Sequence, residues 1–265
     1  MGENYETILL EREGGILTIT LNRPKNLNAM SPQLMGDLKS ALIEAAKDSE
    51  IKVLVITGAG RAFCAGGDVE LDLAYITKLS SLEVREYLAG FASVIQTIYH
   101  MEKPVIAAIN GVAVGGGCDL VMACDIRIAS EKAKFGMAYI RMGIVSDLGG
   151  VYFLPRLVGM GRAKLLCFTG DIVTAEYAEK IGLVDQVVPE SELKGAVDEL
   201  AKKLASGPTQ AIGLYKHALH QSSHMDLDTS LLYTNQIQQL LVTTEDFKEA
   251  FTSFLEKRTP NFKGR

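Results

Sequence analysis

The first half of the chain alternates between short apolar runs and longer segments with helical spacing. Residues 7–10 and 16–21 flank Gly14 and Gly15, a pattern typical of a β-hairpin. Residues 53–56 and 105–109 are apolar runs of β-branched character that end at turn signals, as buried strands do. Residues 82–99, between them, have the spacing of a helix. The alternation predicts an α/β fold.

An earlier helix is predicted to begin at Ser31-Pro32. Leu34, Leu38 and Leu42 follow on one helical face. Ser31 is the expected N-cap, and Pro32 suits the first helical position because its missing N–H is not needed there.

Beyond residue 190 the sequence predicts helices with little strand signal left. We divide the chain accordingly into an α/β core at residues 1–190 and a helical region at residues 191–265. Phe247, Phe251 and Phe254 give the last helix an aromatic stripe, which its own domain or a second subunit must cover. The predicted helices are residues 190–205, 208–221, 226–241 and 244–257.

Composition narrows the class of protein. The 265 residues, 48% of them hydrophobic, allow one large domain with its own core. The 27 Lys and Arg against 32 Asp and Glu give a net charge of −5 with no basic run, so we expect no nucleic-acid and no membrane partner. The chain shows no membrane-spanning window and no export signal, so we expect a cytoplasmic protein.

The four cysteines show no CxxC spacing, so we expect reduced, buried thiols and not a disulfide or zinc framework. They are Cys64, Cys118, Cys124 and Cys167.

Two stretches of the chain repeat one pattern of strand, turn, glycine-rich loop and aspartate. The first leads from residue 53 to Asp68 and the second from residue 105 to Asp119. Two such units side by side present unobstructed backbone N–H groups at one end of a sheet, where a developing oxyanion is stabilised. Gly67 and Gly116 are our candidate donors, the latter at the start of a helix through residues 120–124. Alternatively, the glycines only permit tight packing and Asp119 caps the helix.

Other chemistries lack their motifs. The glycines form neither G-x-G-x-x-G nor G-x-x-x-x-G-K-[ST], which disfavours a nucleotide cofactor, and no G-x-S-x-G elbow is present for a serine hydrolase. His217, His220 and His224 share a helical face, but a solvated or interface face explains them better than a metal site. We expect no metal.

Asp147 is a second candidate for chemistry. It lies between Val145 and Leu148, just before Gly149-Gly150. Apolar surroundings raise the pKa of a carboxyl toward values useful in general acid-base catalysis. The alternative is an N-cap for a helix through residues 151–157.

At these residues the sequence resembles the enoyl-CoA hydratase/isomerase, or crotonase, family over nearly its whole length. The most specific segments are residues 63–68, 108–119 with Cys124-Asp125, and 169–184. The resemblance implies a crotonase-like spiral of ββα units with a C-terminal helical trimerisation region. It implies an acyl-CoA thioester whose carbonyl is held by the N–H groups of Gly67 and Gly116. No cofactor is implied beyond the coenzyme A of the substrate, and self-association is as a trimer or a dimer of trimers.

The resemblance also implies the contacts to the CoA moiety. Phe254 and Lys257 are expected at its adenine end, contributed by a neighbouring subunit. The other implied contacts are Ala65, Gly66, Asp68 and Val69 along the CoA, with Lys25 and Leu27 near the adenine.

Two departures from the family hydratases decide the subclass. The glutamate pair of those hydratases falls here at Asp119 and Tyr139. Shortening Glu to Asp withdraws the carboxylate, and misplacement on the order of 1 Å costs roughly 100-fold in rate. Tyrosine, with a pKa near 10, is not an ionised base at neutral pH. These substitutions disfavour a standard two-glutamate hydratase.

The resemblance also places Asp147 at a position where some isomerases of the family look to have an essential aspartate. We therefore expect a double-bond isomerase in which Asp147 removes an allylic proton and a dienolate forms on Gly67 and Gly116. Asp119 returns the proton or orients a water, and Tyr139 donates a hydrogen bond or lines the acyl pocket. The rivals are a hydratase of a cyclic or diene enoyl-CoA and a non-catalytic acyl-CoA-binding protein.

Overall fold

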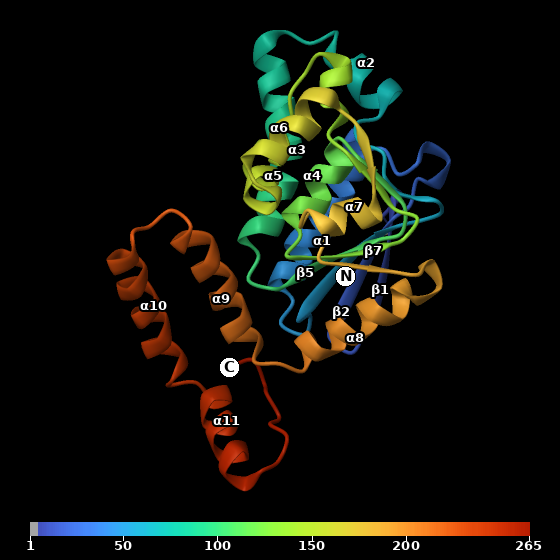
Figure 1. Ribbon diagram of the computed structural model, residues 1–265. Helices are drawn as coiled ribbons and strands as arrows, with labels where there is room; N and C mark the ends of the chain where they lie inside the picture. The colour runs from blue at the N-terminus through green and yellow to red at the C-terminus, as the bar shows by residue number, and fades with distance from the viewer. Residues whose placement is uncertain (1–4) are drawn as a thin grey trace.

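A twisted, mostly parallel sheet forms the centre of the fold in the computed structural model, which describes residues 5–265 (Figure 1). Its strand order is β1-β2-β3-β5-β7-β10, with only the β1–β2 pair antiparallel within it. The strands are β1 (Ile8–Glu13), β2 (Ile16–Leu21), β3 (Val53–Gly58), β5 (Val105–Ile109), β7 (Ile126–Ser130) and β10 (Gln186–Val188).

A second sheet has the order β4-β6-β8-β9. Each of β3, β5 and β7 in the first sheet is followed along the chain by a strand of the second, so the chain winds in a spiral of repeating units. The predicted spiral of ββα units is therefore confirmed. The strands are β4 (Ala62–Cys64), β6 (Val112–Val114), β8 (Lys134–Gly136) and β9 (Ile172–Thr174).

Local sequence signals account for the first elements. Gly14 and Gly15, both with positive φ, turn the chain between β1 and β2, where a side chain would be strained. The Ser31 hydroxyl accepts the Leu34 N–H at 3.2 Å and caps α1, as predicted. The hairpin and this helix start were both visible in the sequence.

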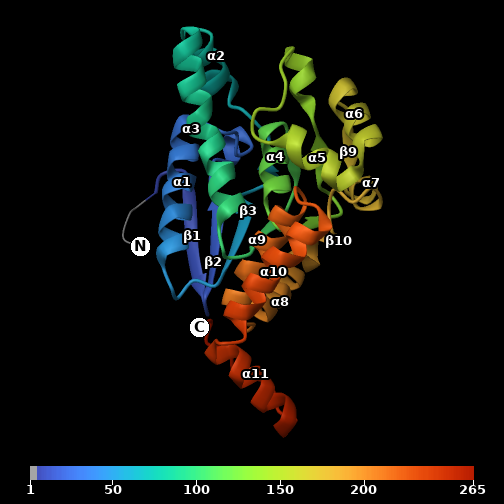
Figure 2. The ribbon, with the colours of Figure 1, turned by 90° about the vertical axis from the view of Figure 1, so that its left-hand side faces the viewer.

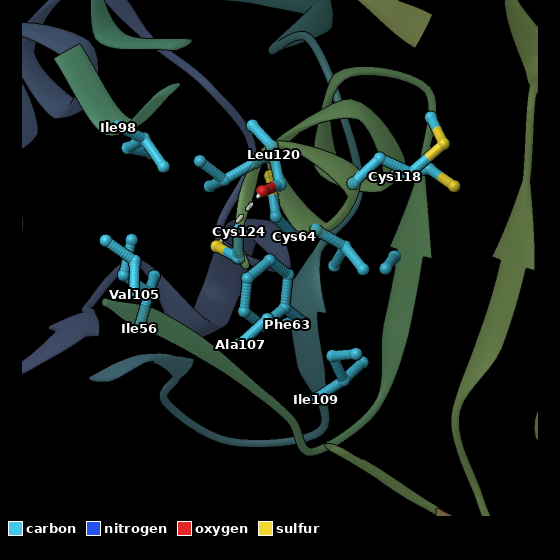
Figure 3. Packing of buried hydrophobic residues seen from close by; sticks show 14 of the residues in the cluster. Ile56, Phe63, Cys64, Ile98, Val105, Ala107, Ile109, Cys118, Leu120 and Cys124 are labelled. Carbon is cyan, nitrogen blue, oxygen red and sulfur yellow. Dashed lines mark hydrogen bonds between the residues drawn. The ribbon is translucent and has the colours of Figure 1, made fainter. Parts of the chain in front are cut away.

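Helices cover both faces of the first sheet because β3 alternates its side chains. Val53 and Val55 pack with α8 in one apolar cluster, while Leu54 and Ile56 belong to the larger core on the opposite face. Figure 3 shows part of that larger core, in which Phe63 lies among apolar residues of several strands.

The helices that precede residue 209 include α8, which packs in the cluster on the opposite face of the sheet from this core. They are α1 (Pro32–Lys47), α2 (Ala74–Ile76), α3 (Ser81–His100), α4 (Gly116–Ala123), α5 (Gly150–Val158), α6 (Met160–Thr169), α7 (Ala175–Lys180) and α8 (Leu193–Ala205), with short helical turns η1 (Pro24–Asn26), η2 (Val69–Leu73), η3 (Ala138–Met142) and η4 (Glu190–Glu192).

The last three helices extend away from the core (Figures 1 and 2). They are α9 (Thr209–Ser222), α10 (Leu227–Leu241) and α11 (Glu245–Glu256), close to the predicted ranges. The aromatic stripe of α11 is uncovered in the single chain, and Phe254 is 80% exposed. Helix α8, although it follows residue 190, packs on the first sheet. The division into a core at residues 1–190 and a helical region at residues 191–265 stays a prediction.

Two expectations from composition can be compared with the structure. Cys64, Cys118 and Cys124 are buried free thiols, and Cys167 is partly buried. Within residues 5–265, no helix is long and apolar enough to cross a membrane.

Candidate active site

The two glycine-rich loops meet, as the repeated pattern predicts. Gly66 has φ +93°, and a Cβ placed on it would lie 3.4 Å from the Gly116 nitrogen and 2.8 Å from the Val114 oxygen. A side chain at position 66 would therefore separate the two loops. Glycine here permits the approach of two backbones.

The N–H groups of both candidate donors are free of regular pairing. Met30 forms an isolated parallel bridge with Gly67: the Met30 N–H donates to the Gly66 oxygen, and the Asp68 N–H donates to the Met30 oxygen. In this pattern the Gly67 N–H points away from Met30. Gly116 is the first residue of α4, where the backbone N–H has no intrahelical acceptor. The arrangement suits an oxyanion, and the positive end of the α4 dipole adds to it.

Asp119 is enclosed in a hydrogen-bond network. Its side chain is fully buried in the first turn of α4. One carboxylate oxygen, Oδ2, accepts the Tyr139 hydroxyl at 2.6 Å and the Ser146 hydroxyl at 2.7 Å. Burial raises the pKa of Asp119 to about 7, although these two hydrogen bonds lower it, and the charge of Asp147 raises it further. Asp119 and Tyr139 are thus brought together, in contact with each other.

Gly150 closes this network from the other side. Its N–H donates to the Ser146 hydroxyl at 2.8 Å, and a Cβ on it would lie 2.2 Å from Asp119 Oδ1. The sequence reading did not single out Ser146, since a lone serine carries no spacing signal. The turn at 146–150 is therefore built around the buried carboxyl.

Asp147 has a different environment from Asp119. It lies in the loop between η3 and α5 and is exposed in the single chain. Loss of surrounding water nevertheless raises its pKa, and within residues 5–265 only its own backbone amide hydrogen-bonds the carboxylate. The N-cap of α5 is Gly149, without a side-chain cap, so the alternative role for Asp147 as a helix cap is wrong. Asp119 likewise does not cap α4, whose N-cap is Gly115.

The structure adds a carboxyl that the sequence reading missed. Asp72 is 6% exposed and accepts the Tyr87 hydroxyl at 3.0 Å, and its Oδ2 lies 2.7 Å from where a Cβ on Gly67 would be. Burial raises its pKa to about 6 against the Tyr87 hydrogen bond. The signal was its position between Leu71 and Leu73, the same apolar flanking that singled out Asp147.

The residues expected along the CoA moiety fall into two groups. One group lies by the glycine loop: the Ala65 N–H donates to the Leu27 oxygen at 3.0 Å, and Val69 is 68% exposed. Asp68 is buried in an ion pair with Arg23 at 2.8 Å. Although burial raises its pKa, the Leu71 N–H and Arg23 lower it overall. Asp68 therefore holds the loop rather than facing solvent.

The second group lies far from the loop within one chain. Phe254 is on α11 and Lys257 directly after it, at the end of the molecule opposite the loops (Figure 1). Their expected contribution from a neighbouring subunit stays a prediction.

The histidine face is engaged in local contacts. His220 stacks on Tyr99 with ring centroids 4.0 Å apart, and His224 Nε2 lies 2.9 Å from the Tyr152 hydroxyl. No group of three His, Cys, Asp or Glu suited to a metal ion occurs in the part of the chain that the structure describes.

Comparisons with known proteins agree with this geometry. The family model described as enoyl-CoA hydratase/isomerase matches residues 11–265. A crotonyl-CoA hydratase from Syntrophomonas wolfei is 41% identical, over 97% of this chain and 98% of that protein. A 1,2-epoxyphenylacetyl-CoA isomerase from Escherichia coli is 36% identical, over 98% and 99%. The crystal structure of an enoyl-CoA hydratase from Bacillus anthracis superposes with a TM-score of 0.92 at 36% identity, covering 98% of this chain and all of that one.

Proposed function

Because this chain belongs to the enoyl-CoA hydratase/isomerase family, we propose that it moves a double bond in an enoyl- or dienoyl-CoA through a thioester dienolate. The observation that carries the proposal is the contrast between its two carboxyls. Asp119 is tied down by two hydroxyls, whereas the Asp147 carboxylate has no side-chain anchor within residues 5–265.

The proposed reaction begins at the thioester carbonyl. The N–H groups of Gly67 and Gly116 receive the oxygen and stabilise the negative charge as the dienolate forms. Coenzyme A is part of the substrate, and the proposal needs no further cofactor. Preformed donors favour the transition state because they need no rearrangement when the charge appears.

Asp147 is the proposed base for the allylic proton. Loss of surrounding water raises the pKa of Asp147, which makes its carboxylate a stronger base than that of an ordinary aspartate. Asp119 then acts as an orienting group. Its carboxylate accepts the hydroxyls of Tyr139 and Ser146, and these hydrogen bonds hold Tyr139 and the 146–150 turn in place.

A hydratase acting on a cyclic or diene enoyl-CoA is the second candidate. The names of two similar relatives support hydration as the reaction, without specifying a cyclic or diene acyl group: the crotonyl-CoA hydratase and a short-chain-enoyl-CoA hydratase from Clostridium acetobutylicum, the latter 40% identical over 97% of this chain. In that reaction Asp119 and Asp147 would share one water. A non-catalytic acyl-CoA-binding protein is the candidate of another class.

The test is mass spectrometry of product from straight 2-enoyl, 3-enoyl, dienoyl and cyclic dienoyl-CoA thioesters. We expect a product of unchanged mass and new retention time from a 3-enoyl or dienoyl thioester. Gain of one water on a cyclic or diene substrate would overturn the isomerase in favour of the hydratase. Binding without conversion of any thioester would favour the non-catalytic protein.

The assembly and location belong to the same proposal. The exposed stripe of Phe247, Phe251 and Phe254 supports self-association through the last helices, as a trimer or a dimer of trimers. In such an assembly Phe254 and Lys257 reach the CoA of a neighbouring subunit. Lys25, Leu27, Ala65, Gly66 and Val69 bind it from their own chain, and Asp68 holds their loop in place through its ion pair with Arg23. We place the enzyme in the cytoplasm. A monomer by light scattering would contradict the assembly.

A further inference from the structure

The best-placed carboxyl outside the assigned pair is Asp72. It lies in η2, the turn that directly follows the first glycine-rich loop and folds back over it. A Cβ placed on Gly67 would lie 2.7 Å from Asp72 Oδ2 and 3.6 Å from Leu73 Cδ2. The absence of a side chain at position 67 therefore leaves room for the carboxyl of Asp72.

The two oxygens of Asp72 have different surroundings. Oδ1 accepts the hydroxyl of Tyr87, which comes from α3 and packs against Phe91 in a tilted ring pair with centroids 5.0 Å apart. Oδ2 is the oxygen next to Gly67. The hydrogen bond fixes the carboxyl so that its second oxygen occupies the space beside Gly67 into which a side chain would project.

Isomerisation needs two proton transfers, and Asp119 is poorly placed for the second. Its side chain is fully buried, one oxygen already accepts two hydroxyls, and Gly150 packs against the other. Asp72 instead places Oδ2 beside Gly67, one of the two candidate oxyanion donors, and the Tyr87 hydroxyl occupies only Oδ1. We propose, on the premise that the chain is the isomerase described above, that Asp72 is the acid that returns the proton to the dienolate.

The proton balance closes without another reagent. With a 3-enoyl-CoA, Asp147 takes a proton from C2, the electron pair passes into the thioester dienolate, and the Asp72 O–H gives its proton to C4 as the C2–C3 double bond forms. Asp147 is then protonated and Asp72 ionised, and solvent water carries one proton from the first to the second.

Electrostatics supports this order of events. The groups whose charges act on Asp72 are Asp147 from the loop before α5, Asp68 on its own segment and the Tyr87 hydroxyl on α3. Before the reaction, the carboxylates of Asp147 and Asp68 favour the protonated form of Asp72. Once Asp147 has taken the C2 proton and is neutral, the negative charge of the dienolate oxygen beside Gly67 replaces it. Asp72 therefore holds its proton while the dienolate exists, which is when an acid is required.

The test is Asp72→Asn in deuterated water with a 3-enoyl-CoA, because asparagine keeps the shape and an acceptor for Tyr87. We expect isomerisation to fall by about 100-fold or more, the lower end for loss of a general acid. Deuterium should still enter C2 of the unreacted substrate near the wild-type rate, since Asp147 remains. Glu70→Gln, an exposed carboxylate of the same turn, is the matched control and should leave both rates unchanged.

Three outcomes decide the matter. Wild-type isomerisation by Asp72→Asn, or equal loss of isomerisation and exchange, overturns the proposal. Absence of both reactions in the wild type instead overturns the isomerase itself. Tyr87→Phe gives an independent reading: it removes a bond that lowers the pKa of Asp72, so the alkaline limb of turnover should move to higher pH.

Discussion

The two walls of the candidate site are built in different ways. One wall is backbone, formed where the loop of Gly66 and Gly67 approaches Gly116 through Gly66. The other is made of carboxyls that differ in burial, from the fully buried Asp119 to the exposed Asp147. The first wall specifies where a negative oxygen can sit, and the second decides which bond is made or broken. A family that shares the first wall can therefore vary its reaction through the second.

The largest expected effect is on the carboxyl wall, at Asp147. Asp147→Asn should lower kcat about 10²- to 10⁴-fold, the range for loss of a general base, with little change in stability because the side chain is exposed. Steady-state kinetics and thermal unfolding measure the two quantities. Near wild-type turnover in Asp147→Asn together with a dead Asp119→Asn would reverse the roles assigned to the two carboxyls.

On the backbone wall, Gly116→Ala should cost roughly 100-fold in kcat, because the new Cβ moves a donor that must be placed within a fraction of an ångström. That Cβ would lie 2.8 Å from the Met30 sulfur and 3.1 Å from Leu148 Cδ1. Gly90→Ala, where a Cβ meets nothing within 4 Å, is the control. Equal kinetics in the two variants would show that the Gly116 N–H is not a donor.

The buried carboxyl of Asp119 should affect the free energy of unfolding more than the reaction rate. The folded state raises the pKa of Asp119 to about 7 and so binds a proton that the unfolded chain has released. Stability from this group is therefore lost as pH rises from about 4 to 7, by about 1.4 kcal/mol per unit of pKa shift. Urea unfolding of Asp119→Asn and wild type should show the variant gaining stability relative to wild type over that range. A constant difference between them would contradict the raised pKa.

The smallest effects should come from the hydroxyls that hold Asp119. Tyr139→Phe and Ser146→Ala each remove one hydrogen bond to the carboxylate, at a cost of roughly 1.5–3 kcal/mol where Asp119 is ionised. Below a pH of about 7, where the Asp119 carboxyl is protonated, the loss of unfolding free energy should be smaller. Unfolding at pH 6 and pH 8 checks this. A larger loss at pH 6 would mean that the hydroxyls stabilise the neutral form.

The backbone wall was predictable because the residues that form it give signals in short stretches of sequence. Glycine runs after buried strands, and a helix start at Gly116, need no knowledge of distant residues. The carboxyl wall was less predictable because burial and hydrogen bonding depend on segments far apart in the chain. Asp119 meets Ser146 across 27 residues, and Tyr87 reaches Asp72 across 15. Apolar flanking found Asp147, and applied more widely it would have found Asp72.

The fold divides in a similar way. The hairpin, the Ser31 cap and the last helices followed from turn residues and periodicity. The second sheet did not, because its strands span only three residues each and pair across the spiral, leaving little periodicity to read.

The central claim is that Asp147 removes a proton next to a thioester whose oxygen rests on Gly67 and Gly116. It is tested most directly with phenylacetyl-CoA, which has an acidic C2 proton but no alkene to move or hydrate. The measurement is deuterium entry at C2 in deuterated water, by mass spectrometry, for wild type and Asp147→Asn. We predict exchange by the wild type and its loss in the variant. No exchange by the wild type, or undiminished exchange by Asp147→Asn, would contradict the account.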